Sequence, residues 1–277
     1  MTSLAIMNAP NGARPTAADH PRLPLTIDAI AEDAAAVAKA GAEAVHIHVR
    51  DEQGRHVLDA ARHVAAEQAI RRRAGDSLVV QMTTEAVGRY TPRQQIELVQ
   101  AVAPEAVSIA MAELMPDASA EAAALDLYRW MHERRIAVQH ILYTPAEFLR
   151  FADYAARGLI PGDRYSVIFP LGRYASDRQS RPEDLVPFVA ALQEAGGAAR
   201  YDWWVCAFGA LETRLLTATA ALGGHCRIGF ENNFLNSDGR VAADNADRVA
   251  DLTRSLSGIG RPAASREETL RALGRPD

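Results

Sequence analysis

The amino-acid sequence predicts an α/β fold, a single (β/α)8 barrel formed by residues 1–277 as one domain with a C-terminal helix. Short apolar, β-branched runs alternate with longer helical segments along the whole chain, which is typical of βαβ units and a parallel sheet. Eight such runs are present, and no linker or low-complexity tract separates them. A closed barrel accounts for both this count and the length of 277 residues.

The expected strands are the apolar runs themselves, each followed by polar residues. They are 4–9, 44–49, 77–83, 106–111, 137–143, 165–171, 202–208 and 227–231. An open doubly wound sheet is the alternative, because periodicity alone does not show that the last strand pairs with the first. The turn from Pro10 to Pro15 lacks the Gly-rich dinucleotide-binding pattern, so nothing supports that alternative.

Helix start and stop signals lie between these runs. The expected helices begin at a capping residue, often with proline next to it, and several end at glycine. They are 26–41, one from Thr91, 144–158, one from Arg181, 244–258 and a terminal helix at 266–273. This punctuation agrees with the strand assignment, because each helix falls between or after the expected strands.

Composition excludes several classes of function. The 30 Lys and Arg against 35 Asp and Glu, without a basic block, argue against a nucleic-acid partner. The two cysteines, Cys206 and Cys226, lie in apolar runs and do not form a disulfide framework. No apolar stretch approaches the roughly 20 residues that span a bilayer, and Met1 to Pro10 lacks the charged start of a secretory signal. We therefore expect a cytoplasmic protein that is not bound to a membrane.

A metal site is predicted from His46 and His48, which lie two apart on the second strand and so point to the same side of the sheet. Ile47 and Val49 suit the helix layer, which sends both imidazoles into the mouth of the barrel. Glu231 ends the eighth strand, one strand away from the second in a closed barrel. Two histidines and one carboxylate leave positions open for substrate, as in catalytic zinc sites, although Mn, Co or Fe(II) would accept the same ligands.

Two simpler interpretations stand beside this one. His46 and His48 could be core histidines satisfied by hydrogen bonds, and Glu231 could be a loop carboxylate paired with Arg227 or Arg50. The metal hypothesis rests on the joint geometry of the three residues and not on any one of them.

Other polar residues at strand ends line the same mouth and are candidates for substrate contacts. They are Arg14, Arg50, Asp51, Thr83, Thr84, Glu85, Glu113 and Arg173. Arginines near an open metal favour an anionic small molecule, because a guanidinium matches a carboxylate with two hydrogen bonds. Each arginine taken singly could also be a solvated surface charge.

The remaining histidines are assigned structural or exposed positions. His140 faces the helix layer if Gln139, Ile141 and Tyr143 point inward, which we prefer, and it becomes a fourth metal ligand in the opposite case. The others are expected in exposed loops or helices, or exposed just before the last strand; they are His20, His56, His63, His132 and His225.

Several blocks of the chain resemble the beta-keto acid cleavage enzymes. They are Leu23–Thr26, Ala40–Ala42, His46–Asp51 with Gly54, Gly223–Asn233, Asn245 and Gly260–Pro262. The resemblance implies a barrel that is usually a tetramer, with zinc held by His46, His48 and Glu231. It also implies a Claisen-type exchange in which a beta-keto acid and the cosubstrate acetyl-CoA give acetoacetate and a new acyl-CoA. In that reaction Arg227 supports the neighbouring acid, and Thr83 matches a serine or threonine near the site.

Departures from the family pattern change the expected chemistry. Asn232 replaces an aspartate proposed as the base, so Glu85 or a water on the metal has to take its place. Arg14 replaces a glutamate that holds a substrate amine in the aminohexanoate-cleaving enzyme, which favours an anionic or neutral side group. Gln139 and Ile141 replace two acidic residues, and 169–173 replaces a Gly-rich stretch near CoA.

The chain is thus interpreted as a divergent member of the family. One alternative is a metal-dependent hydrolase or aldolase-type barrel that uses no CoA, and another is a degenerate barrel that only binds a carboxylate.

Overall fold

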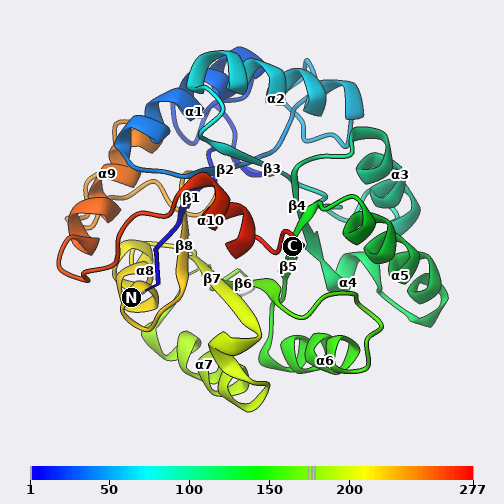
Figure 1. Ribbon diagram of the computed structural model, residues 1–277. Coiled ribbons are helices and arrows are strands. Elements are labelled where there is room, and N and C mark those ends of the chain that lie inside the picture. The colour runs from blue at the N-terminus through cyan, green and yellow to red at the C-terminus, as the bar shows by residue number, and fades with distance from the viewer. Residues whose placement is uncertain (1, 174, 176, 178, 277) are drawn as a thin grey trace.

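Eight parallel strands close into a barrel in the order β1 to β8 (Figure 1). The computed structural model describes residues 2–173, 175, 177 and 179–276. The last strand pairs with the first, with Met7 opposite Arg227 and Asn8 opposite Ile228, so the open-sheet alternative is wrong. The strands are β1 Ile6–Asn8, β2 Ala44–Ile47, β3 Val79–Met82, β4 Ala106–Ala110, β5 Ala137–Ile141, β6 Tyr165–Leu171, β7 Tyr201–Ala207 and β8 His225–Ile228.

The helices surround the barrel as the punctuation predicts. Thr26, Thr91 and Thr144 each cap a helix by accepting a hydrogen bond from a backbone N–H in its first turn. The α-helices are α1 Ile27–Ala40, α2 Ala60–Ala74, α3 Pro92–Val102, α4 Met111–Leu114, α5 Ala118–Glu133, α6 Pro145–Ala156, α7 Leu185–Glu194, α8 Glu212–Ala221, α9 Asn245–Leu256 and α10 Arg266–Ala272. Short 3₁₀ turns, η1 Pro182–Asp184 and η2 Gly197–Ala199, flank α7.

The last helix covers one end of the barrel. In Figure 1, α10 lies in front of the ring of strands, across its amino-terminal end. Leu270 and Leu273 pack into an apolar layer with Met7 and Trp204, and the Trp204 indole donates a hydrogen bond to the Ala272 carbonyl at 2.9 Å. Because this end is closed, the polar side chains of the barrel interior gather at the opposite end, where the strands terminate.

The end of β8 differs from the expected run 227–231. The strand begins at His225 and stops at Ile228, because Gly229 turns the backbone against β1. A Cβ at Gly229 would lie 2.3 Å from the Ala9 carbonyl oxygen, so only glycine fits this approach. Glu231 then donates its backbone N–H to the same carbonyl at 3.1 Å. Glu231, the predicted third ligand, is therefore held in a turn above β1 and not on the strand itself.

The expectation of exposed histidines is wrong for four of the five residues. His20, His56, His63 and His225 are only 2–6% exposed, whereas His132 is half-buried. The His225 ring stacks on Trp204 and accepts a hydrogen bond from the Ala5 backbone 220 positions away. His20 packs on Phe230, which is equally remote in sequence. Such burial arises from long-range packing, which local sequence patterns do not report.

Among the helices of the described residues, none is long and apolar enough to cross a membrane.

Candidate metal centre

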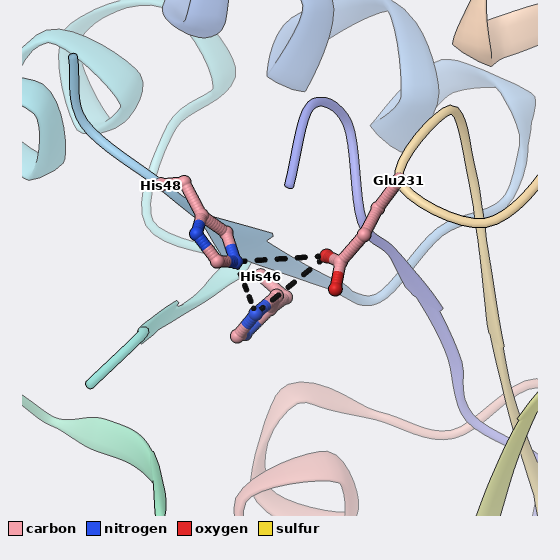
Figure 2. Close-up of side chains that lie close together, drawn as sticks. All are labelled: His46, His48 and Glu231. Carbon is pink, nitrogen blue, oxygen red and sulfur yellow. Dashed lines mark hydrogen bonds and ion pairs between the residues drawn. The ribbon is translucent and has the colours of Figure 1, made fainter. Parts of the chain in front are cut away.

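Three side chains converge at the carboxyl end of the barrel, as the sequence predicts (Figure 2). His46 lies on β2 and His48 directly after it, and both imidazoles point into the barrel because Ile47 and Val49 pack against the helices. Glu231 reaches them from the turn after β8, with β1 between the two strands. Gly12 allows this approach, since a Cβ there would lie 2.6 Å from the Glu231 Cγ.

The three ligand atoms form a triangle of the size that a small metal ion requires. His46 Nε2 and His48 Nε2 are 3.0 Å apart, and each lies 3.7 Å from Glu231 Oε2. Tetrahedral bonds of about 2.0–2.2 Å to zinc place such atoms roughly 3.3–3.6 Å apart. The separations bracket this value, so an ion can bind after small side-chain adjustments.

The hydrogen bonds of the ligands also suit a cation. Glu231 Oε2 is buried and has no hydrogen-bond partner among the described residues. His46 Nδ1 lies 2.8 Å from Gln81 Oε1, and the Gln81 amide nitrogen is engaged with Gln139, which identifies Oε1 as the acceptor. His46 therefore carries its proton on Nδ1 and presents an unprotonated Nε2 to the site. A buried carboxylate oxygen facing unprotonated nitrogen calls for a cation between them.

Burial keeps both imidazoles neutral. It lowers the pKa of His46 to about 4 and that of His48 well below its ordinary value, with repulsion from neighbouring cationic groups in the same direction. Neutral imidazole is the form that binds a metal, so neither ligand has to lose a proton at neutral pH. The residues present fit a divalent transition ion.

Arg227 holds the second oxygen of the metal-site glutamate. It extends inward from β8, and its Nη2 donates to Glu231 Oε1 at 3.3 Å and to Cys206 Sγ at 3.2 Å. The predicted ion pair between Arg227 and Glu231 is therefore present together with the triad and not in place of it. The Nε and Nη1 groups of Arg227 are buried without a hydrogen-bond partner in the described part of the chain. Arg227 also lines a pocket beside the three candidate ligands.

That pocket opens beside the triad at the mouth of the barrel. Apart from His46, His48 and Glu231, it is lined by Thr83, Thr84, Glu85, Ala110, Glu113, Ile141, Tyr143, Pro170, Arg173, Phe208 and Arg227. Most of the predicted strand-end residues thus share one pocket with the candidate ligands.

Glu85 is the carboxyl group best placed to exchange a proton in this pocket. Its Oε2 lies 3.8 Å from His48 Nδ1, and its Oε1 lies 3.0 Å from Arg173 Nη2 and 3.9 Å from Arg14 Nη1. Burial raises the pKa of Glu85 to about 7, and repulsion from Glu231 and Glu113 acts in the same direction. A carboxyl group with such a pKa can act as a base near neutral pH.

The other predicted residues take different positions. Thr83 Oγ1 accepts from the Glu85 backbone N–H at 3.1 Å, and Glu113 accepts from the Ala86 N–H at 2.9 Å, so both support the loop that carries Glu85. The Arg14 side chain is 49% exposed at the mouth. Arg50 donates to backbone carbonyls of the β1–α1 loop, and its contact with substrate stays a prediction.

His140 and Asn232 both lie away from the pocket. His140 packs against Phe151 and binds the Ser166 carbonyl through Nδ1, so it faces the helices, as predicted, and is no fourth ligand. Asn232 is buried, lies outside the pocket lining, and its amide has no partner among the residues described. A role of Asn232 in catalysis stays a prediction.

Sequence reasoning missed two residues that contact the ligands. Gln81 lies two residues after Val79 on β3, on the same side of the strand, and so had a period-two signal for an inward side chain. His56 lies in the loop between β2 and α2, where no pattern marks it, yet its ring lies beside His48.

Fold and site together define an enzyme class. Residues 3–274 match the beta-keto acid cleavage enzyme family, and the chain belongs to that family. It is 25% identical over 280 residues to the 3-keto-5-aminohexanoate cleavage enzyme of Fusobacterium nucleatum, covering 99% of this chain and 98% of that protein.

The chain is also 25% identical over 281 residues to the 3-oxoadipate:acetyl-CoA acetyltransferase of Cupriavidus necator, covering 100% of this chain and 96% of that protein. The solved structure of ObcA with oxaloacetate shares the fold, with a TM-score of 0.73 at 14% identity over 93% of this chain and 68% of that chain.

Proposed function

We propose that the protein is a metal-dependent beta-keto acid cleavage enzyme that exchanges acyl groups between an anionic beta-keto acid and acetyl-CoA, giving acetoacetate and a new acyl-CoA. The observation that carries the proposal is the convergence of His46, His48 and Glu231 beside Arg227, whose Nε and Nη1 have no hydrogen-bond partner among the described residues. Candidate metal ligands and a guanidinium with Nε and Nη1 left without a partner among the described residues suit a substrate that carries a carboxylate.

A zinc ion held by the triad would supply a Lewis acid for the oxygens of the keto acid. The protein groups have separate tasks. Arg227 binds the carboxylate of the keto acid through Nε and Nη1. Glu85 removes a proton from the carbon between the carboxylate and the keto group. That carbon then bonds to the acetyl carbonyl of acetyl-CoA as the CoA thiolate leaves. The thiolate attacks the original keto carbon, the bond from this carbon to the central carbon breaks, and the new acyl-CoA forms. Protonated Glu85 returns its proton to the central carbon, and acetoacetate departs.

Glu85 is preferred as the base on chemical grounds. An amide such as Asn232 cannot accept a proton at neutral pH, whereas the raised pKa of Glu85 suits that task. Glu85 also lies in the pocket, within 3.8 Å of a metal ligand.

The arginines at the mouth of the barrel indicate the charge of the substrate's side group. Arg14 and Arg173 both lie beside Glu85 at the pocket entrance, so an anionic group on the substrate meets two guanidinium groups there. One relative of the chain is named for 3-oxoadipate, a beta-keto acid with a second carboxylate. A beta-keto diacid of this kind is the proposed substrate.

The proposal is tested with a panel of beta-keto acids and acetyl-CoA, with acetoacetate as the readout. Metal-loaded protein is expected to turn over 3-oxoadipate faster than 3-oxohexanoate, which lacks the second carboxylate, and faster than 3-keto-5-aminohexanoate. Failure of the metal-loaded protein to release acetoacetate from any member of the panel would contradict the proposal.

Replacing Arg14 by Gln is expected to lower kcat/KM for 3-oxoadipate by up to about tenfold, a modest loss because a half-exposed ion pair is screened by water. The value for 3-oxohexanoate should change much less, and any change reports the effect of Arg14 on Glu85. Arg93, which is 87% exposed on α3, offers a matched arginine-to-glutamine control. Equal losses for both substrates in the Arg14 variant would show that Arg14 does not bind the side group.

A further inference from the structure

His56 is a buried histidine of the β2–α2 loop that touches the metal centre without belonging to its three ligands. Its side chain is 3% exposed. Its Nδ1 lies 3.4 Å from His48 Nδ1, on the side of the His48 ring away from the candidate ion, and its Nε2 lies 2.9 Å from the Glu85 backbone carbonyl oxygen. The ring thus bridges a ligand and the loop that carries Glu85.

The positions of the protons follow from these contacts. A carbonyl oxygen only accepts hydrogen bonds, so the Nε2 of His56 carries a proton. In the neutral ring, Nδ1 is then an acceptor, and it faces His48 Nδ1. The shared hydrogen bond therefore requires a proton on His48 Nδ1, which leaves His48 Nε2 unprotonated and facing His46 and Glu231.

We propose that His56 is a positioning residue of the metal centre, which fixes the tautomer of His48 and couples this ligand to the loop that bears Glu85. This proposal shares one assumption with the proposed function, namely that His46, His48 and Glu231 bind a metal ion. His56 would serve His48 as Gln81 serves His46, so each histidine ligand has its own hydrogen-bond partner.

The coupling also protects the proposed base. Glu85 Oε2 lies 3.8 Å from His48 Nδ1 and is the next acceptor within reach of that proton. While His56 accepts the hydrogen bond, the Glu85 carboxylate stays available to the pocket. Loss of the His56 ring would let Glu85 bind His48 instead, at the expense of proton abstraction from substrate.

A neighbouring histidine supplies a matched control. His63 on α2 is 2% exposed, and neither of its ring nitrogens has a hydrogen-bond partner among the described residues. Replacing either histidine by Leu removes a buried imidazole of the same size. Only the His56 substitution removes a hydrogen bond to a ligand.

The test compares H56L, H56Q and H63L for metal affinity and for the tautomer of His48. Zinc and cobalt affinities are measured by competition with a chelator, and the tautomer is read from imidazole ¹⁵N shifts of metal-free protein. H56L is expected to weaken binding by roughly 10–100-fold and to give mixed tautomers, as for loss of other partners of histidine ligands. H56Q, which keeps an acceptor, should recover most of the affinity, and H63L should bind like the wild type.

The same variants in an E85A background remove the substitute acceptor and should show the full effect of H56L on the tautomer. Wild-type affinity and an unchanged Nδ1–H tautomer in H56L E85A, relative to E85A alone, would overturn the proposal. If H56Q and H63L lost as much metal affinity as H56L, the effect would be one of packing, and the proposal would also be overturned. The tautomer measurement needs neither metal nor substrate, so it decides the role of His56 even if acyl exchange is not found.

Discussion

Replacing Glu231 by Gln is expected to remove metal binding and acyl exchange together. The substitution keeps the size of the side chain but takes away the negative charge that balances a divalent ion between two neutral imidazoles. Loss of a direct ligand should cost more than the roughly 10–100-fold in affinity that loss of an outer partner costs. Chelator competition and the acetoacetate assay measure the two effects.

Two controls separate charge from packing at this position. Glu231→Asp keeps the charge on a shorter side chain and should retain part of the affinity, whereas Gln should not. The metal-free Asp variant should melt closer to the wild type than the Gln variant, because Gln leaves the buried Arg227 guanidinium without its carboxylate partner and the Cys206 thiol is neutral. A Gln variant that binds zinc as tightly as the wild type would show that the ion lies elsewhere.

Replacing Glu85 by Gln is expected to lower kcat by roughly 10²–10⁴-fold, the usual contribution of a general base, with little effect on metal affinity. The wild-type profile of kcat/KM should fall as pH drops through the pKa of Glu85, since only the ionised carboxylate accepts a proton. Burial and repulsion raise this pKa to about 7 in the metal-free site. A bound cation favours the ionised carboxylate and so opposes part of that shift. We therefore expect the acid limb of the pH profile, where kcat/KM falls, to lie between pH 4.5, the ordinary pKa value, and about pH 7.

Glu113 provides the control for the pH profile. Its carboxylate contributes to the raised pKa of Glu85 by repulsion, so Glu113→Gln should move the acid limb to lower pH without abolishing turnover. Glu85→Gln should remove the limb from whatever activity is left. An unchanged limb in the Glu85 variant would assign the base to another group.

The barrel was predictable because its signals are local and repeated. Short apolar runs and helices with capping residues mark the elements, and the alternation of the two permits few topologies. Closure itself was not visible in the pattern and is shown by the pairing of β1 with β8. The end of the last strand was misplaced because apolar residues recur at Ile228 and Phe230, on either side of Gly229, whereas Gly229 ends the strand to pass Ala9.

The convergence of the three candidate ligands was predictable for a similar reason, whereas the residues that contact them were not. The two-residue spacing of His46 and His48 fixes a shared side of β2 whatever the rest of the chain does. His56 reaches its place through a loop, and nothing in its neighbourhood indicates that it lies beside His48. Arg50 also donates to carbonyls of the β1–α1 loop, which its position after β2 does not indicate, and its contact with substrate stays a prediction.

The central claim is that His46, His48 and Glu231 hold a single divalent ion, and anomalous diffraction from crystals of the purified protein tests it most directly. The account predicts one strong peak at the absorption edge of a transition metal, about 2.0–2.2 Å from both Nε2 atoms and from a Glu231 carboxylate oxygen. Absence of such a peak in metal-loaded crystals, or a peak held by other side chains, would contradict it.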